Sequence, residues 1–479
     1  MPVSERYRPA ELFQLLGPEF ADPVAPAQFP QHILRYRNQA WASRVGLDTL
    51  TDDEWRAHFA RFEPLPANMR QPLAMRYHGH QFRVYNPEIG DGRGFLFAQL
   101  RDDAGRLLDL ATKGSGKTPY SRFGDGRLTL KGGVREVLAA EMLETLGVYT
   151  SKAFSLIETG EALTRGDEPS PTRSSVLVRL GHSHIRFGTF QRLAFFERSD
   201  LIRILIDHVV EAYYPALADT EGETRAAAVF GAIVEASARL AASWMAAGFV
   251  HGVLNTDNLN VTGESFDYGP WRFLPTSDPE FTAAYFDETG LYSFGRQPEA
   301  VSWALAQLGG AFSLVCSTPA LEREMPRFGS AYQHGLRSSM FKRLCLAEAD
   351  LDNDLAFLQT LFDWLTKTQA GWDQFFHDWF AGEASAERAA ESPQATLYAD
   401  PAFSPVRDGL AQRSRSDAAG ALTHPYFQRA TPHAMLIDEV EALWAPIAER
   451  DDWGLFETKL AQLAEVREAL ALAHSGSAH

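Results

Sequence analysis

Apolar and polar residues alternate along several segments in the first part of the chain, and this pattern predicts β-strands. The clearest are residues 94–100, GFLFAQL, and residues 107–113, LLDLATK, which are joined by the charged turn 101–106, RDDAGR. Residues 174–181, SSVLVRLG, show a similar apolar run after a loop at 161–173 that is rich in proline, serine and charge. The first part of the chain is therefore expected to be rich in strands.

Two helices are predicted within this strand-rich part. Apolar residues recur at helical spacing over residues 131–147, KGGVREVLAAEMLETLG, and Gly147 is placed to end that helix. Residues 51–62, TDDEWRAHFARF, predict another helix, and Thr51 stands where an N-cap is expected.

From residue 198 onward the pattern becomes helical. Residues 226–249 predict a long, largely apolar helix that leads the chain directly to His251. Residues 297–475 are expected to be mostly helical, with a looser stretch of alanine, serine and proline at 382–420. Strands followed by helices predict an α+β protein, in the two-lobed order of protein-kinase-like folds.

Composition narrows the functional classes. The chain has 479 residues, 45% of them hydrophobic, and a net charge of −17 from 45 basic and 62 acidic residues. Such an acidic balance argues against a nucleic-acid or membrane partner, since both need positive surface. Cys316 and Cys345 are too few for a disulfide framework. No apolar run reaches the ~18 residues of a membrane span, so a cytoplasmic protein is expected, with a monomer favoured.

A glycine-rich turn precedes a lysine at the end of a strand. Residues 90–94, GDGRG, would let backbone amides approach phosphate groups closely. Lys113 ends the strand that follows, where kinase-like folds place a phosphate-binding cation. Glu136, on the next helix, is the predicted ion-pair partner of Lys113, whereas Glu141 is expected to be a solvated charge on the helix face.

Two other motifs in this region are weighed and given different roles. The segment 114–118, GSGKT, is not a P-loop, because the first glycine of that motif would fall on Ala111. The stretch VRLGHSHIRFG supplies Arg179 and Arg186, a candidate pair of anion-binding cations in an acidic chain. The two histidines between these arginines have no third metal ligand nearby and are interpreted as structural.

Residues 251–269, HGVLNTDNLNVTGESFDYG, hold the parts of a kinase-like catalytic loop, with one change. Val253 stands where a kinase keeps its catalytic aspartate. Asn258 and Asp267 are the oxygen ligands that would suit Mg²⁺ next to a bound triphosphate. Asp257 is then the nearby carboxylate that is free to act as a base, since Val253 cannot accept a proton.

Six motifs together resemble one known family. YHGHQFRVYNPEIGDGRG, ATKGSGKTPYSRFGDGR, VREVLAAEML, RLGHSHIRFGTF, GFVHGVLNTDN and FDYGP occur in the order of the SelO (selenoprotein O, or YdiU) family and cover about residues 70–300. The resemblance implies a protein-kinase-like fold that binds ATP in a flipped orientation. It also implies an enzyme that transfers AMP, with release of pyrophosphate, to a serine, threonine or tyrosine hydroxyl of a target protein.

The resemblance assigns roles residue by residue. The residues that it implies bind the nucleotide are Gly90, Gly92, Arg93, Lys113, Asp125, Gly126, Arg179, Arg186 and Asp267. Glu136 would pair with Lys113. The metal ion, Mg²⁺ or Mn²⁺, would be held by Asn258 and Asp267. Asp257 would accept the proton of the hydroxyl. The expected partners are ATP and protein substrates.

Four units are expected along the chain: an N-terminal extension (1–70), a strand-rich nucleotide-binding lobe (71–197), a helical lobe with the catalytic and metal-binding loop (198–330), and a helical C-terminal extension (331–479).

Three alternatives to protein adenylylation stay open: a protein uridylyltransferase that uses UTP, a kinase-like phosphotransferase, and a nucleotide-binding pseudoenzyme. Val253 argues against the kinase, and the retained metal ligands argue against the pseudoenzyme.

Overall fold

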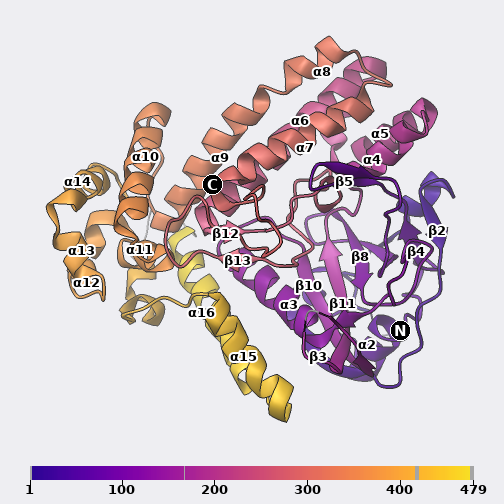
Figure 1. Ribbon diagram of the computed structural model, residues 1–479, viewed down its shortest axis with the longest axis horizontal. Helices are drawn as coiled ribbons and strands as arrows, with labels where there is room; N and C mark the ends of the chain where they lie inside the picture. Colours follow the sequence, from indigo (N-terminus) through magenta and orange to yellow (C-terminus); the bar gives the residue numbers. More distant parts are fainter. Residues whose placement is uncertain (1–2, 167, 416–419, 475–479) are drawn as a thin grey trace.

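The computed structural model describes residues 3–166, 168–415 and 420–474 (Figure 1). Strands gather in the N-terminal half of the chain, and helices make up most of the rest. The predicted α+β class, with strands before helices, is confirmed.

The main sheet is antiparallel, with the strand order β2–β4–β7–β8–β11–β10–β3. Its strands are β2 (Ala21–Pro23), β3 (Ile33–Arg37), β4 (Leu73–Met75), β7 (Leu96–Arg101), β8 (Leu107–Lys113), β10 (Lys152–Leu163) and β11 (Thr172–Gly181). Two short strands attach to this path: β1 (Pro9–Ala10) pairs with β7, and β9 (Leu128–Thr129) pairs with β11. A separate hairpin is formed by β5 (Gly79–Gln81) and β6 (Val84–Asn86).

Residues 1–70, expected to form an extension, contribute β1, β2 and β3 to the main sheet. They also hold two short helices, α1 (Gln39–Arg44) and α2 (Asp52–Phe59). The predicted N-cap of α2 is confirmed: Thr51 accepts a hydrogen bond from the Glu54 amide, and the Glu54 side chain accepts one from the Thr51 amide.

The helix α3 (Leu130–Thr145) packs against β10 and β11 and is buried along most of its length. Glu141 on this helix was expected to be solvated, and that prediction was wrong. Its side chain is buried and accepts hydrogen bonds from Tyr36 Oη (2.6 Å) and Arg467 Nη1 (2.7 Å). Residues distant in sequence therefore cover a face of α3 that looked exposed.

The helical half is built around α6 (Gly222–Ala247), against which α7 (Gln297–Phe312), α8 (Thr318–Glu324) and α9 (Arg327–Leu344) pack. Two helices, α4 (Phe187–Phe195) and α5 (Ser199–Tyr213), connect the sheet to this group. Within the described residues, α6 alone is long and apolar enough to cross a membrane, and most of it is buried inside the protein. Gly248 ends α6 in the left-handed region, at a φ of 64°.

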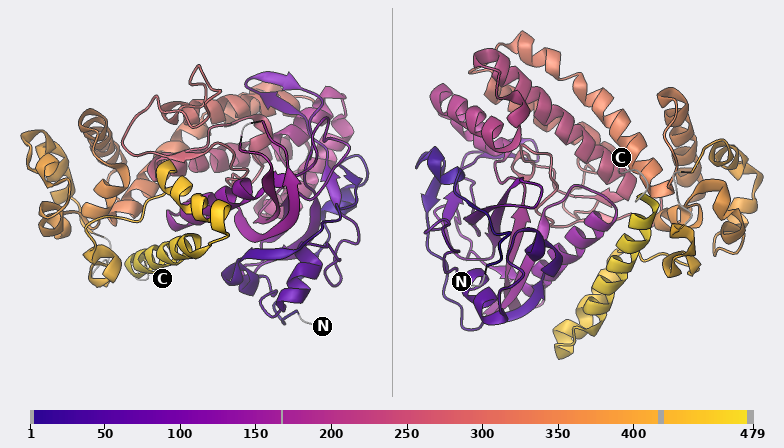
Figure 2. Two further views of the ribbon diagram at one scale, coloured as in Figure 1. Left: turned by 60° about the horizontal axis from the view of Figure 1, so that its bottom comes forward. Right: turned by 180° about the vertical axis from the view of Figure 1, so that it is seen from behind.

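The C-terminal part forms a helical group beside α9 and then returns to the sheet side (Figures 1 and 2). Its elements are α10 (Leu351–Thr368), α11 (Trp372–Asp378), α12 (Ala386–Ala390), α13 (Ala395–Ala399), α14 (Ser404–Ala411), α15 (Ile437–Arg450) and α16 (Gly454–His474). The looser stretch predicted at 382–420 forms a series of short helices over its described residues. Both α15 and α16 pack on α3, so the end of the chain covers the helix that carries Glu136.

Candidate active site

A cleft of about 720 Å³ is lined by glycine-rich turns, the ends of β8 and β11, and loops of the helical half. The predicted residues that line it are Gly90, Gly92, Arg93, Lys113, Asp125, Gly126, Arg179, Arg186, Asp257 and Asp267. Glu136 and Asn258 do not line the cleft, but each lies directly beside residues that do. The fold thus brings into one space residues that are more than 170 positions apart in the chain.

At the inner wall of the cleft, a buried lysine holds two carboxylates together. Lys113 ends β8, and its Nζ contacts Glu136 Oε1 on α3 and Asp267 Oδ1, the latter at 2.7 Å. The packing of α3 under the sheet places Glu136 behind the lysine. Because the surroundings are buried, this pairing fixes the position of the ammonium group.

Asp267 is held ionised by a cluster of cations. Arg179 Nη1 lies 3.1 Å from Asp267 Oδ1, and among the described residues no other carboxylate pairs with that guanidinium. Burial alone would raise the pKa of Asp267, but Lys113 and the nearby arginines hold it well below its usual range. The carboxylate is therefore negative at any physiological pH.

Arg186, predicted to bind the nucleotide, is firmly anchored within the cleft. Its Nη1 donates to the Asp257 carbonyl oxygen (2.8 Å), and its Nη2 lies 3.3 Å from Asp91 Oδ1. The guanidinium group also lies over the Tyr77 ring, 4.4 Å from its centre. Asp91 lies inside the GDGRG turn, but only the glycines and Arg93 of that turn were predicted to belong to the site.

Asp257 is a buried carboxylate with one uncommitted oxygen. It lies in a short 3₁₀ turn, Thr256–Asn258, and among the described residues no group donates a hydrogen bond to its Oδ1. Burial raises its pKa to about 6, and Arg186 limits the rise. A carboxylate with this pKa is ionised at neutral pH and is still basic enough to take a proton.

Asn258 and Asp267 each have a side-chain oxygen that no described hydrogen bond or ion pair uses. Asn258 Nδ2 donates to the Val253 carbonyl (2.9 Å), so the amide oxygen of Asn258 is left as an acceptor. Both ion pairs of Asp267 use Oδ1, which leaves Oδ2 available. Two oxygens of this kind suit Mg²⁺, which takes few protein ligands when it also binds phosphate. The described residues hold no group of three or more His, Cys, Asp or Glu arranged around one metal position.

The glycine-rich turns are closely packed, which explains their composition. A Cβ added to Gly90 would lie 2.5 Å from the Tyr120 ring. Gly126 has a φ of +73°, and a Cβ there would collide with the backbone of Gly116. Asp125 lines the cleft, but its carboxylate is bound by Arg165 Nη1 at 2.8 Å. Arg165 was not predicted, because it lies in a loop that showed no periodic pattern.

The β5–β6 hairpin positions the loop that carries Asp257, and sequence reasoning missed this contact. The His80 amide donates to Thr256 Oγ1 (2.7 Å), and the Phe82 amide donates to Asn255 Oδ1 (3.0 Å). Thr256 Oγ1 donates in turn to Gln191 Oε1 at 2.6 Å. The residues belong to the motifs YHGHQF and NTDN, but nothing in either motif shows that they touch.

Thr256→Val is expected to disturb this positioning while leaving the nucleotide contacts in place. The hydroxyl removed is buried and bonds two partners, so stability should fall by about 1–3 kcal/mol. We expect kcat to fall about tenfold with a nearly unchanged KM for the nucleotide. Thr256→Ser keeps the hydroxyl and should restore kcat. Steady-state kinetics that show equal losses for both variants would contradict the positioning role.

Comparisons with known proteins show the family to which the chain belongs. The family described as "Protein adenylyltransferase SelO" matches residues 3–464. The chain belongs to the SelO family of protein adenylyltransferases. It is 46% identical over 471 residues to "Protein nucleotidyltransferase YdiU" of Synechococcus elongatus, which covers 95% of this chain and 94% of the relative.

Other relatives in this family share the same printed name. The Trichodesmium erythraeum protein is 43% identical over 479 residues, and the match covers 96% of this chain and 98% of that relative. The Pseudomonas putida GB-1 protein is 38% identical over 414 residues, and the match covers 85% of this chain and 80% of that relative. As a member of this family, the chain is a protein nucleotidyltransferase, and the resemblance stated from its motifs is confirmed.

Proposed function

We propose that this protein transfers AMP from ATP to serine, threonine or tyrosine hydroxyls of other proteins and releases pyrophosphate. The strand-rich and helical halves then correspond to the two lobes of a protein-kinase-like fold, with ATP between them. The observation that carries the proposal is Asp257, a buried carboxylate with a pKa of about 6. It faces the cleft beside Asn258 and Asp267, while Val253 replaces the base of a kinase.

The inner end of the cleft is suited to the leaving group. Lys113 and Arg179 contact Asp267, and Arg186 contacts Asp91, so three buried cationic side chains lie in the lining of the cleft. Pyrophosphate leaves with its negative charge increased, and donors fixed in advance at that position lower the energy of the transition state. A flipped ATP, with the γ-phosphate innermost, would leave the α-phosphorus nearer to Asp257.

The proposed reaction needs one proton acceptor. Asp257 takes the proton of the target hydroxyl as that oxygen forms a bond to the α-phosphorus, and the bond from the α-phosphorus to the bridging oxygen of pyrophosphate breaks. Asn258 and Asp267 would hold Mg²⁺, which, when bound, offsets phosphate charge and orients the phosphate oxygens. Glu136 keeps Lys113 in place throughout.

Label transfer tests the reaction class. Wild-type protein is incubated with cell lysate and ATP that is labelled on either the α- or the γ-phosphate. Relative to the same lysate without the protein, we expect additional protein-bound label from the α-phosphate only, and additional label from the γ-phosphate would instead indicate a kinase. A parallel reaction with α-labelled UTP distinguishes adenylylation from uridylylation, because the relatives' shared name specifies only a nucleotidyl group.

A further inference from the structure

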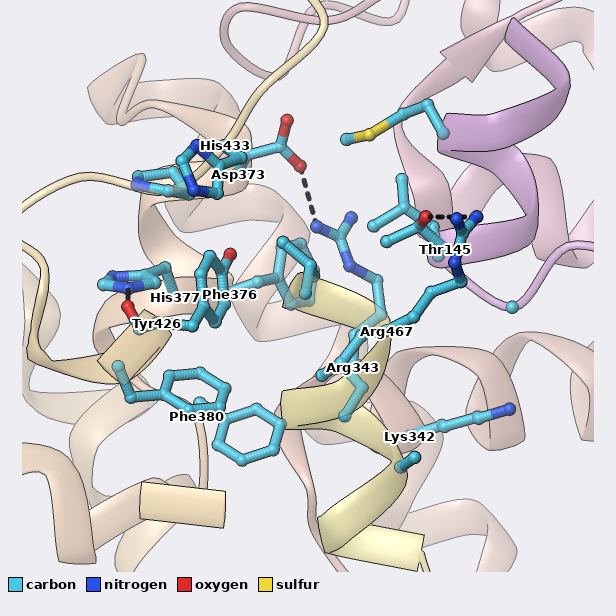
Figure 3. Close-up of a pocket in the computed structure, with 18 of the residues that line it drawn as sticks. Thr145, Lys342, Arg343, Asp373, Phe376, His377, Phe380, Tyr426, His433 and Arg467 are labelled. Carbon is cyan, nitrogen blue, oxygen red and sulfur yellow. Dashed lines mark hydrogen bonds and ion pairs between the residues drawn. The ribbon is translucent and has the colours of Figure 1, made fainter. Parts of the chain in front are cut away.

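A second cavity, of about 320 Å³, lies where α3, α9, α11 and α16 meet (Figure 3). It shares no lining residue with the active-site cleft. Segments from both halves of the molecule and from the C-terminal part build its walls, so the cavity depends on the complete fold. A volume of this size lies in the range of small-molecule sites in proteins.

One side of the cavity is aromatic. Its wall is formed by Phe376, Phe380, Tyr426 and Phe427, which are buried, and Leu470 of α16 closes it. Figure 3 shows Phe376, Phe380 and the His377 ring gathered on this side. Rings that are already ordered in the protein give a flat apolar ligand contact area at little cost in conformational entropy.

Two arginines, Arg343 and Arg467, also line the cavity, and the Arg343 guanidinium lies over the Phe376 ring, 4.0 Å from its centre. Arg343 Nη2 binds Asp373 (2.7 Å), and Arg343 Nη1 donates to the Ala246 carbonyl (2.7 Å). Among the described residues, the side-chain hydrogen bonds of Arg467, to Glu141 and Thr145, all use Nη1. The Nε and Nη2 groups of Arg467 thus stay available as donors to a further acceptor.

The charges around the cavity leave one cation in excess. Arg343 and Arg467 are each matched by a carboxylate, Asp373 and Glu141. Lys342, also in the lining, has no carboxylate within ion-pair distance in the described part of the chain. The remaining carboxylate in the lining, Glu144, is bound to Lys152 and to the Trp41 indole. In a chain of net charge −17, this is a local site for a negative ligand.

We propose that this cavity is a second binding site, for a small organic monoanion with an apolar ring. The ring would lie against the aromatic wall, and the anionic group would accept hydrogen bonds from Arg467 and attract Lys342. Part of the lining, Met142 and Thr145, belongs to α3, the helix that also carries Glu136. The proposal does not depend on the reaction at the cleft.

Two dyes of matched shape test the proposal on the full-length protein. 8-Anilinonaphthalene-1-sulfonate has an aromatic body and one negative charge, and N-phenyl-1-naphthylamine has the same rings without the charge. We expect both dyes to fluoresce on binding. The substitution Ala471→Trp, which fills the cavity from α16, should lower the affinity for each dye at least tenfold. Lys342→Gln should weaken the anionic dye about two- to fivefold and leave the neutral dye unchanged.

Lys367→Gln, at an exposed lysine on α10 beside a different hollow, is the matched charge control and should change neither affinity. Ala471 is exposed, so the tryptophan is expected to leave the melting temperature near the wild-type value. Wild-type affinity for both dyes in Ala471→Trp would overturn the site. Equal effects of Lys342→Gln on the two dyes would overturn its preference for an anion.

Discussion

Asp257→Asn is expected to slow nucleotide transfer by about 10²–10⁴-fold while the affinity for ATP stays within a few fold of the wild type. The substitution keeps the size of the side chain but removes the carboxylate that we propose takes the proton from the target hydroxyl. Arg186 binds the backbone carbonyl of residue 257, so that contact survives the change. Initial rates of α-label transfer, together with a separate nucleotide-binding titration, measure the two quantities.

The pH dependence of the wild type gives an independent check on the same residue. Burial raises the pKa of Asp257 to about 6, and only the ionised form can accept a proton. Activity should therefore be constant above this pH and fall about tenfold for each unit below it. The residual activity of Asp257→Asn should lack this inflection. An inflection near pH 6 that persists in the variant would show that a different group is the base.

Asp267→Asn is expected to abolish transfer and also to destabilise the protein. Asp267 pairs with Lys113 and Arg179 at the inner wall of the cleft, and an amide there leaves Arg179 without its carboxylate partner and Lys113 with Glu136 alone. We expect the free energy of unfolding to fall by about 3 kcal/mol. Added Mg²⁺ should not restore the rate, because the substitution also replaces the charged member of the two predicted metal ligands with a neutral amide.

Asp354→Asn is the matched control for the loss of stability. Asp354 is more deeply buried than Asp267 and lies 3.2 Å from Arg413, but it belongs to the C-terminal part and does not line the cleft. The substitution Asp354→Asn should lower the free energy of unfolding but leave the transfer rate, and the dependence of that rate on Mg²⁺, unchanged. Rates and denaturant titrations across a series of Mg²⁺ concentrations separate the two effects. Wild-type activity in Asp267→Asn would exclude the metal assignment.

The sequence predicted the elements well where one periodicity determines the structure. The strand that ends at Lys113, the helix α3 and the long helix before His251 all follow from apolar spacing, and each is present. Glu141 was misjudged because the groups that cover it, Tyr36 and Arg467, are distant in the chain. No local pattern reports such a contact.

Contacts in the candidate site could be predicted where the order of elements along the chain places two residues next to each other. Lys113 and Glu136 were paired from their positions on successive elements, and their contact is direct. The partners of the other charges were not predictable, since Arg165 and Asp91 lie in loops. The hairpin contact to Thr256 also joins segments that are more than 170 residues apart.

The coproduct of a single reaction tests the central claim most directly. The wild-type protein, a protein acceptor, Mg²⁺ and ATP are followed by phosphorus NMR, while the nucleotide bound to the acceptor is quantified. Transfer of AMP predicts one pyrophosphate released for each AMP bound to protein, and pyrophosphate formation at least about 100-fold slower in Asp257→Asn. ADP formed in step with a phosphorylated acceptor, and no pyrophosphate, would contradict the account.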